Sequence, residues 1–370
     1  MREKPFLSQV CIERDEIEAV ERVMRSGKLS GYRANKGQYT GGSEISKLCL
    51  EWSNHFEVEH VIPVNSCTSG LFVALKAAGK LKTVAVSPYS MTCSASLPKD
   101  LQMITNFVDV DLDYFQLQMD DPQLHDVSMP VSLFGHPLTK AYGSDIVIED
   151  SAQCVSKQLH KTHLRVHSYT EGKHITSGEG GLITTDDPLL AEECRLIMNH
   201  AESVIHDRGA HQKTIGYNLR MIEMQAALVR SQLKRLDENV RIRQDNVSYL
   251  NARIGKIPGI RPGKVAEKGV HSYYCAPFHY ERTSVSRDRF LAAVRAELSN
   301  CRLNSGYIKP LYRLQCFNNT TRSLRLKNVE HLWSRELFLI MDIAYPHTLE
   351  DMRDIARAFE KVADNGKNIP

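Results

Sequence analysis

The chain has 370 residues, of which 42% are hydrophobic and 25% are charged, and its formal net charge is +3. These values are typical of a soluble globular protein with more than one domain. No cluster of Lys and Arg could follow a phosphate backbone, and no apolar stretch approaches a signal peptide or a membrane span, so we expect a cytoplasmic protein that binds neither nucleic acid nor membranes.

Two amphipathic helices are predicted near the N-terminus. The first spans residues 14–26 and stops before Gly27, and its apolar face is formed by Ile17, Val20, Val23 and Met24. A polar, Gly-rich loop follows. The second helix begins at Ser43, and its apolar residues at helical spacing are Ile45, Leu48, Trp52 and Phe56.

Short apolar segments then alternate with helical and loop segments. A helix is predicted at residues 68–79, and strands are predicted at residues 61–65, 83–86, 104–110, 130–134, 146–150 and 181–185. This alternation is typical of an α/β fold with a doubly wound, mostly parallel central sheet flanked by helices.

The pattern changes in the last third of the chain. A long helical stretch is predicted from near Met221. Strand-like residues 271–280 follow, and further helices are predicted at residues 286–298 and 351–365. We therefore expect a large domain at residues 1–240 and a smaller C-terminal α+β domain at residues 241–370.

The nine cysteines are scattered along the chain and are never spaced as CxxC. A disulfide framework needs paired cysteines, and a zinc site needs ligands at a suitable spacing. We expect reduced thiols and no metal site.

Ligands of open α/β sheets bind beyond the carboxyl ends of the strands. This rule selects the polar residues 66–68, 89–94, 150–153 and 168–173. Asp150 ends an apolar strand, where a carboxylate is costly to bury without a partner. It could cap a following helix, or it could pair with the cationic ring nitrogen of a cofactor.

Lys173 lies five residues after Ser168 and shortly before the turn GEGG. Such a lysine is often a solvated surface charge, but a buried amine of lowered pKa is nucleophilic toward an aldehyde. Residues 66–70 open a helix after a strand, so their backbone amides and the hydroxyls of Thr68 and Ser69 could bind an anion. Helix capping explains the same residues equally well.

Together these segments resemble the DegT/StrS family of sugar aminotransferases, which have the fold-type I architecture of enzymes that use pyridoxal 5'-phosphate (PLP). The resemblance covers nearly the whole chain and is most specific in SYTEGKHITSGEGGLITT (168–185) and IGYNLRM (215–221). Further matching segments are LSGYR (29–33), VNSCTSGLFVAL (64–75), SPYSMTCSAS (87–96), VIEDSAQ (147–153), NHAES (199–203) and GYIKPLY (306–312).

The resemblance implies how the cofactor is held. Lys173 would carry PLP as an imine, a Schiff base, and act as the catalytic base and acid, while Asp150 would pair with the ring nitrogen. Gln153 would hydrogen-bond the ring hydroxyl. Met91 stands where many members place an aromatic ring against the cofactor face. The residues implied to hold the phosphate are Cys67, Thr68 and Ser168.

The resemblance also implies a homodimer with shared active sites, in which Asn218 reaches the phosphate of the neighbouring subunit. Asn218 could instead cap a helix. Tyr307 and Arg33 would lie near the substrate. The implied reaction moves an amino group from glutamate or glutamine to a keto-sugar, in a nucleotide-linked form, as a step of amino sugar biosynthesis.

Two alternatives stay open. Sugar dehydratases of the same family carry His where this chain has Lys173, so the lysine argues against a dehydratase. The retained Lys173, Asp150 and Asn218 argue against a non-catalytic regulatory or binding member. Two segments are shorter than usual for the family, the connection from Ala78 to Thr83 and the stretch from Ala152 to Ser168. We expect these differences to affect the geometry at the rim of the site and the choice of substrate.

Overall fold

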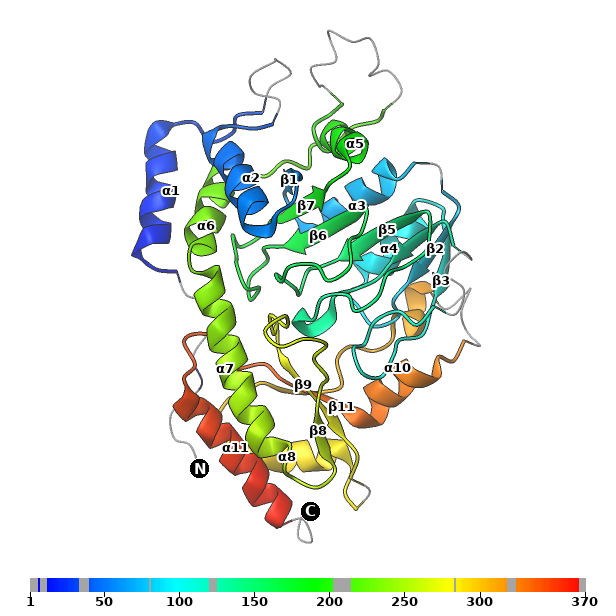
Figure 1. Cartoon of the computed structure of the whole chain (residues 1–370), viewed down its shortest axis with the longest axis vertical. Helices are drawn as coiled ribbons and strands as arrows, with labels where there is room; N and C mark the ends of the chain where they lie inside the picture. The colour runs from blue at the N-terminus through cyan, green and yellow to red at the C-terminus, as the bar shows by residue number, and fades with distance from the viewer. Residues whose placement is uncertain are drawn as a thin grey trace.

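The structure is a computed structural model that describes residues 6, 12–32, 40–79, 81–119, 125–201, 214–282, 284–317 and 324–365. Two β-sheets form its centre, and helix α7 (Leu236–Ile254) runs along the molecule beside both of them (Figure 1). None of the described helices is long and apolar enough to cross a membrane. The eight described cysteines are all free thiols.

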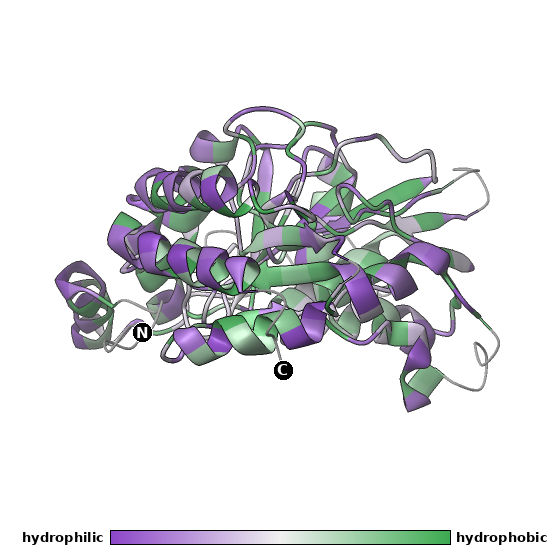
Figure 2. Ribbon diagram, turned by 90° about the horizontal axis from the view of Figure 1, so that it is seen from below, coloured by the Kyte–Doolittle hydropathy of each residue, from purple (hydrophilic) through white to green (hydrophobic). Residues whose placement is uncertain are grey.

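The larger sheet has the strand order β1-β7-β6-β5-β4-β2-β3. Its strands pair in parallel except at β7, which is antiparallel to both β1 and β6, so the predicted mostly parallel sheet is confirmed. The strands are β1 (His60–Val64), β2 (Thr83–Val86), β3 (Ile104–Phe107), β4 (Val127–Met129), β5 (Ile146–Asp150), β6 (Leu164–Ser168) and β7 (Gly181–Thr185). Figure 2 shows predominantly apolar strands between helices whose outer faces are polar.

Helices cover this sheet because each presents an apolar stripe to it. Helix α2 (Ser43–Phe56) packs on β1 and on α6 (Glu223–Leu233), and all four of its predicted apolar residues are buried. Three neighbouring helices that also pack on the sheet are α3 (Cys67–Ala77), α4 (Cys93–Asp100) and α5 (Pro188–Met198). The helical stretch predicted from near Met221 is confirmed, although a break at residues 234–235 divides it into α6 and α7.

Helix α1 (Arg14–Ser26) has the predicted bounds but buries only part of the predicted apolar face. It packs on α6 through Ala19 and Val23, whereas Ile17 and Met24 are 60% and 61% exposed. The exposed residues, with Ile12 and Val20, line an apolar hollow on the surface. An exposed apolar patch of this kind is typical of a surface that another chain covers.

The predicted strand at residues 130–134 is also wrong. The strand β4 ends at Met129, and residues 133–135 form the 3₁₀ turn η2, in which Phe134 has a φ of 58°. Only an isolated bridge from Val131 to Asp150 continues the pairing. The apolar run is explained by burial of this turn, since Leu133 and Phe134 are each 1% exposed.

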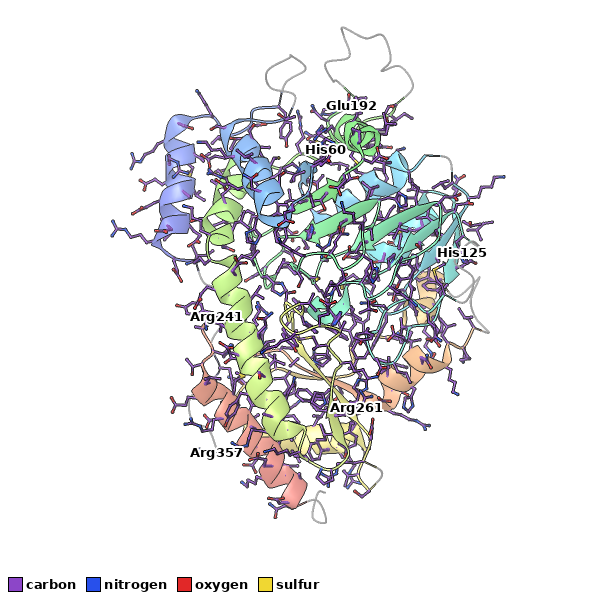
Figure 3. The ribbon with its side chains drawn as sticks, viewed as in Figure 1. His60, His125, Glu192, Arg241, Arg261 and Arg357 are labelled. Atoms are coloured by element: carbon purple, nitrogen blue, oxygen red, sulfur yellow. The ribbon has the colours of Figure 1, made fainter. Side chains whose placement is uncertain are left out.

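The smaller sheet is antiparallel throughout, with the order β10-β11-β9-β8, and it has a hydrophobic core of its own. Its strands are β8 (Ile260–Pro262), β9 (Ala276–Tyr280), β10 (Leu303–Ser305) and β11 (Leu337–Ile340), and the associated helices are α8 (Arg287–Glu297) and α11 (Leu349–Asp364). The short helix α10 (Lys327–His331) packs on the core of the larger sheet through Val329. Charged side chains such as Arg241 on α7 and Arg357 on α11 lie on the outside (Figure 3). The domain boundary at residue 240 stays a prediction.

Candidate active site

The carboxyl ends of β1, β2, β5 and β6 meet at one edge of the larger sheet, where the predicted polar segments follow them. β7 begins at this edge, and its first residue Gly181 pairs with Val64 of β1 and with Ser168 of β6. A Cβ on Gly181 would lie 2.8 Å from the backbone nitrogen of Cys67. Glycine therefore allows β7 to start directly against the first turn of α3.

Asp150 is the last residue of β5, and its side chain is buried at this edge. Its Oδ2 accepts a hydrogen bond of 2.9 Å from the hydroxyl of Ser94, and its Oδ1 accepts one of 3.1 Å from the amide of Ala152. No helix follows within residues 151–163, so the bond to Ala152 closes a turn and the helix-cap alternative is wrong. Burial raises the pKa of Asp150, although these bonds and Lys173 oppose the shift.

Lys173 lies in the loop after β6, and its Nζ is 4.5 Å from the centre of the Tyr274 ring. The amide of Tyr274 donates a 2.8 Å hydrogen bond to the carbonyl of Phe134, which holds Tyr274 against the larger sheet. Burial lowers the pKa of Lys173, while Asp150 and neighbouring thiols oppose the shift. A lysine amine is nucleophilic only when it is neutral, so burial prepares Lys173 to attack a carbonyl carbon.

Helix α3 begins at the same edge and offers an anion site. Its N-cap Ser66 accepts a 3.0 Å hydrogen bond from the amide of Ser69. Within the described residues the amides of Cys67 and Thr68 make no hydrogen bond, and the first turn contains no acid. Unpaired amides at a helix N-terminus attract anions. Ser168, buried at the end of β6, lies beside this turn through its pairing with Gly181.

Gln153 and Tyr307 meet although 154 positions separate them in the sequence. Nε2 of Gln153 donates a 2.9 Å hydrogen bond to the hydroxyl of Tyr307, and Oε1 accepts one of 2.9 Å from the amide of Phe134. The amide of Tyr307 in turn donates to the hydroxyl of Tyr89 at 2.8 Å. The structure therefore brings Tyr307 to the same edge as the predicted cofactor residues.

Two predicted residues lie on the surface of the chain. Met91 precedes α4 and is 54% exposed. Asn218 is exposed, and its Oδ1 accepts a 2.9 Å hydrogen bond from Nε of Arg220. The N-cap of α6 is Ile222, so the alternative that Asn218 caps this helix is wrong. Arg33 lies outside the described residues.

Residues 10–360 match the DegT/DnrJ/EryC1/StrS aminotransferase family. The chain belongs to this family. Among DegT/StrS relatives, the spore coat polysaccharide biosynthesis protein SpsC of Bacillus subtilis is 25% identical over 386 residues, which cover 95% of each chain. GDP-perosamine synthase of Caulobacter vibrioides is 29% identical over 276 residues, covering 67% of this chain and 74% of that protein.

The fold of this DegT/StrS aminotransferase is shared with solved structures. PseC of Helicobacter pylori, an aminotransferase of pseudoaminic acid biosynthesis, superimposes with a TM-score of 0.82 at 20% identity. The superposition covers 98% of this chain and 100% of PseC. The predicted fold-type I architecture is therefore confirmed.

The enzymes of this family use PLP, and three features of the site fit that cofactor. The buried carboxylate of Asp150 has no cationic partner within hydrogen-bond distance among the described residues, the first amides of α3 are unpaired, and the amine of Lys173 is buried. Asp150 suits the ring nitrogen, Cys67 and Thr68 suit the phosphate, and Lys173 suits covalent attachment. When bound, PLP supplies an electron sink for the carbon that loses a proton.

Several contacts of the site could not be predicted from the motifs. Ser94 contacts Asp150, and Tyr274 contacts Lys173. Of these two partners, only Ser94 lies in a segment that matches the family, SPYSMTCSAS (87–96). Glu223 accepts hydrogen bonds from the amides of Gly42 at 3.0 Å and Glu44 at 2.7 Å. It thereby ties the residues after the early loop to the segment that contains Asn218. The nearest signal in the sequence was the matching segment IGYNLRM (215–221), which ends two residues before Glu223.

Proposed function

We propose that this aminotransferase moves the amino group of glutamate or glutamine to a keto-sugar in a nucleotide-linked form. The observation that carries the proposal is the buried amine of Lys173 at the same sheet edge as the buried carboxylate of Asp150. The substrate class is supported by the similarity to GDP-perosamine synthase, whose name indicates a nucleotide-linked amino sugar.

The residues of this chain divide the work of transamination. Burial lowers the pKa of Lys173 and so favours its neutral amine, which would take the proton from the amino-bearing carbon of the substrate. Asp150, held by Ser94 and Ala152, would pair with the ring nitrogen of bound PLP and favour its protonated form. The hydroxyl of Tyr307 accepts from Gln153 and keeps its own proton for the keto-substrate.

We further propose a homodimer with shared active sites. The exposed apolar residues Ile17 and Met24 of α1 supply a surface that a second copy would cover. Asn218 is exposed at the end of β1, since the neighbouring Leu219 carbonyl accepts a 2.8 Å bond from the amide of Asn65. From this place the amide of Asn218 would contact the phosphate held by the partner.

The test supplies glutamate labelled with ¹⁵N at the α-amine, or glutamine labelled in the same way, together with PLP and one keto-substrate at a time. The substrates are nucleotide-linked keto-sugars, free keto-sugars and a keto-cyclitol. We expect ¹⁵N in an amino-sugar nucleotide, detected by mass spectrometry, and none with the Lys173→Ala variant.

The rival functions give different products. A dehydratase would remove a hydroxyl group from the sugar without taking up ¹⁵N, and a binding protein would leave every substrate unchanged. Labelling of the cyclitol alone would contradict the nucleotide-sugar assignment while keeping the aminotransferase activity.

A further inference from the structure

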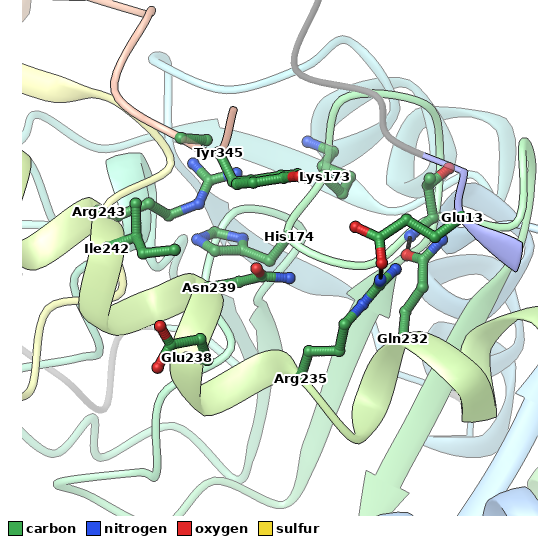
Figure 4. A pocket seen from close by; sticks show the side chains of 12 residues that line it. Glu13, Lys173, His174, Gln232, Arg235, Glu238, Asn239, Ile242, Arg243 and Tyr345 are labelled. Carbon is green, nitrogen blue, oxygen red and sulfur yellow. Dashed lines mark hydrogen bonds and ion pairs between the residues drawn. The ribbon is translucent and has the colours of Figure 1, made fainter. Parts of the chain in front are cut away.

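A cavity of about 270 Å³ opens beside helix α7 and reaches Lys173 (Figure 4). Its walls come from the lysine loop, from the end of α6 and the first half of α7, from Glu13 before α1, and from residues 344–345 before α11. Lys173 is the one residue of the proposed cofactor site among those that line it. The cavity therefore adjoins the sheet edge that holds Asp150 and the start of α3 through Lys173.

Arg243 forms part of the cavity wall and is a buried cation, with 4% of its surface exposed. Its Nη1 donates to the carbonyls of Tyr273 at 2.9 Å and Tyr274 at 3.4 Å. Within the part of the chain that the structure describes, Nε and Nη2 make no hydrogen bond and no carboxylate lies within ion-pair distance. Burial lowers its pKa to about 10. Burying a charge without a counterion costs free energy, so binding of an anion would stabilise this guanidinium.

The acids around the cavity are already paired with other arginines. Glu13 pairs with Arg235, and Glu238 pairs with Arg241. Figure 4 shows Arg235 directed to Glu13, while Arg243, Lys173, His174 and Asn239 surround the open space. His174 is buried, and its Nε2 donates a 3.0 Å hydrogen bond to the carbonyl of Ser272. Burial lowers the pKa of His174 well below its usual value, so this side chain adds no positive charge to the cavity. Among the described residues, the cavity thus keeps the guanidinium of Arg243 without an acidic partner, beside the amine of Lys173.

We propose that this cavity binds a small carboxylate anion between Arg243 and Lys173. A guanidinium presents its N–H groups in a planar fork that matches the two oxygens of a carboxylate. The nearby amide of Asn239, for which no side-chain hydrogen bond is found among the described residues, supplies a neutral donor.

The bound anion acts on the proton of Lys173, because a negative charge nearby favours the ammonium form. In the protein without this anion, the groups that already act on Lys173 in that direction are Asp150, Cys67, Cys93 and Cys275. A carboxylate in the cavity adds to them from the side of α7 and raises the pKa of Lys173. This effect on the free enzyme does not depend on which substrate is aminated.

Acetate is the probe, and the protein is the full chain without PLP at constant ionic strength. Calorimetric titration and saturation-transfer NMR measure binding to the wild type and three variants. We expect Arg243→Met to abolish binding and Arg243→Lys to retain part of it. Asn239→Leu, which removes the amide donor and narrows the cavity but leaves Arg243 in place, should weaken binding at least tenfold. Arg253→Met is the control, since Arg253 lies on the same helix and pairs with Glu360.

The proton state of Lys173 is a second readout. Acetate is expected to shift the pH dependence of Lys173 acylation, followed by mass spectrometry, to higher pH in the wild type and not in Asn239→Leu. Absence of acetate binding to the wild type, or binding to Arg243→Met as tight as to the wild type, would overturn the proposal. Displacement of acetate by an equal concentration of chloride would overturn the carboxylate assignment. None of these outcomes depends on transamination, so the proposed function is tested separately.

Discussion

The hydroxyl of Ser94 donates a hydrogen bond of 2.9 Å to Oδ2 of Asp150. Ser94 lies in the first turn of α4, after β2, whereas Asp150 ends β5, and β4 lies between these two strands in the sheet. Both side chains are buried, so the bond stabilises a carboxylate that burial disfavours. Oγ of Ser90 lies 2.9 Å from Oγ of Ser94 and extends the chain of hydroxyls.

Ser94→Ala should lower activity by making Asp150 harder to ionise. A hydrogen bond to a charged group contributes about 1.5–3 kcal/mol, so a loss of roughly tenfold or more in kcat/KM is expected. Because the lost bond favoured the charged form, the pKa of Asp150 rises further, and the acidic limb of the pH profile moves to higher pH.

Ser90→Ala is the matched control for this measurement. It removes a buried hydroxyl from the same chain but leaves the bond from Ser94 to Asp150 in place. In Ser90→Ala, the acidic limb of the pH profile of kcat/KM should stay at its wild-type position. If both variants moved the limb equally, the shift would reflect local packing rather than the bond to Asp150.

Asp150→Asn should retain PLP but slow the proton transfer steps by several orders of magnitude. A neutral amide cannot hold a proton on the ring nitrogen, so the electron sink is lost. The expected rise in the barrier is on the order of 4 kcal/mol, since each 1.36 kcal/mol is about tenfold in rate. Single-turnover kinetics with glutamate measure this step, and a rate near the wild-type value would show that Asp150 has only a structural role.

Lys173→Met should stabilise the protein without PLP. Burial lowers the folded-state pKa of Lys173 below 10.5, so between the lowered value and 10.5 the unfolded chain binds more protons. The stability of the wild type therefore rises with pH through this window, whereas the variant lacks this dependence. We expect a higher Tm for the variant near neutral pH and a smaller difference as the pH approaches 10.5, measured by scanning calorimetry.

Lys161→Met is the control for this pH dependence. Lys161 is exposed, and its ion pair with Asp186 raises rather than lowers its pKa. Its replacement should bring no gain in Tm near neutral pH. A gain of the same size in both variants would mean that the added methionine, not the removed buried amine, stabilises the protein.

Mixed dimers test whether Asn218 serves the neighbouring subunit. A Lys173→Ala subunit is combined with an Asn218→Asp subunit, whose added charge repels phosphate, and the heterodimer is purified through two different tags. With shared sites, one site carries both defects and the other carries neither. Up to half of the wild-type activity should return, although each parent homodimer is nearly inactive.

A heterodimer without activity would contradict the shared site, provided that mass spectrometry shows both chains in it. In that case each site keeps one defect, as expected if Asn218 acts within its own subunit. A heterodimer of Lys173→Ala with wild type, which has at least one intact site, shows the activity that a single site can reach.

The sequence by itself determined the elements whose residues repeat at a clear period. Helix α2 buries its four predicted residues, and strands β2, β5 and β7 have the predicted bounds, because alternation and helical spacing are local properties of the chain. The motifs likewise predicted that Asp150 and Lys173 lie beyond the carboxyl ends of strands, and the structure has Asp150 at the end of β5 and Lys173 in the loop after β6, while their catalytic roles stay a prediction.

Tertiary structure decided what lies around these residues. The order of the strands brings Ser94 to Asp150 and Tyr274 to Lys173, and the path of α7 places Arg243 in the wall of a cavity. Neither the strand order nor the path of α7 is specified by a local period in the sequence. For the same reason the apolar run at residues 130–134 was mistaken for a strand, although a buried turn satisfies it equally well. Hydrophobicity determines that a segment is buried, but the partner against which it is buried is decided only when distant parts of the chain pack together.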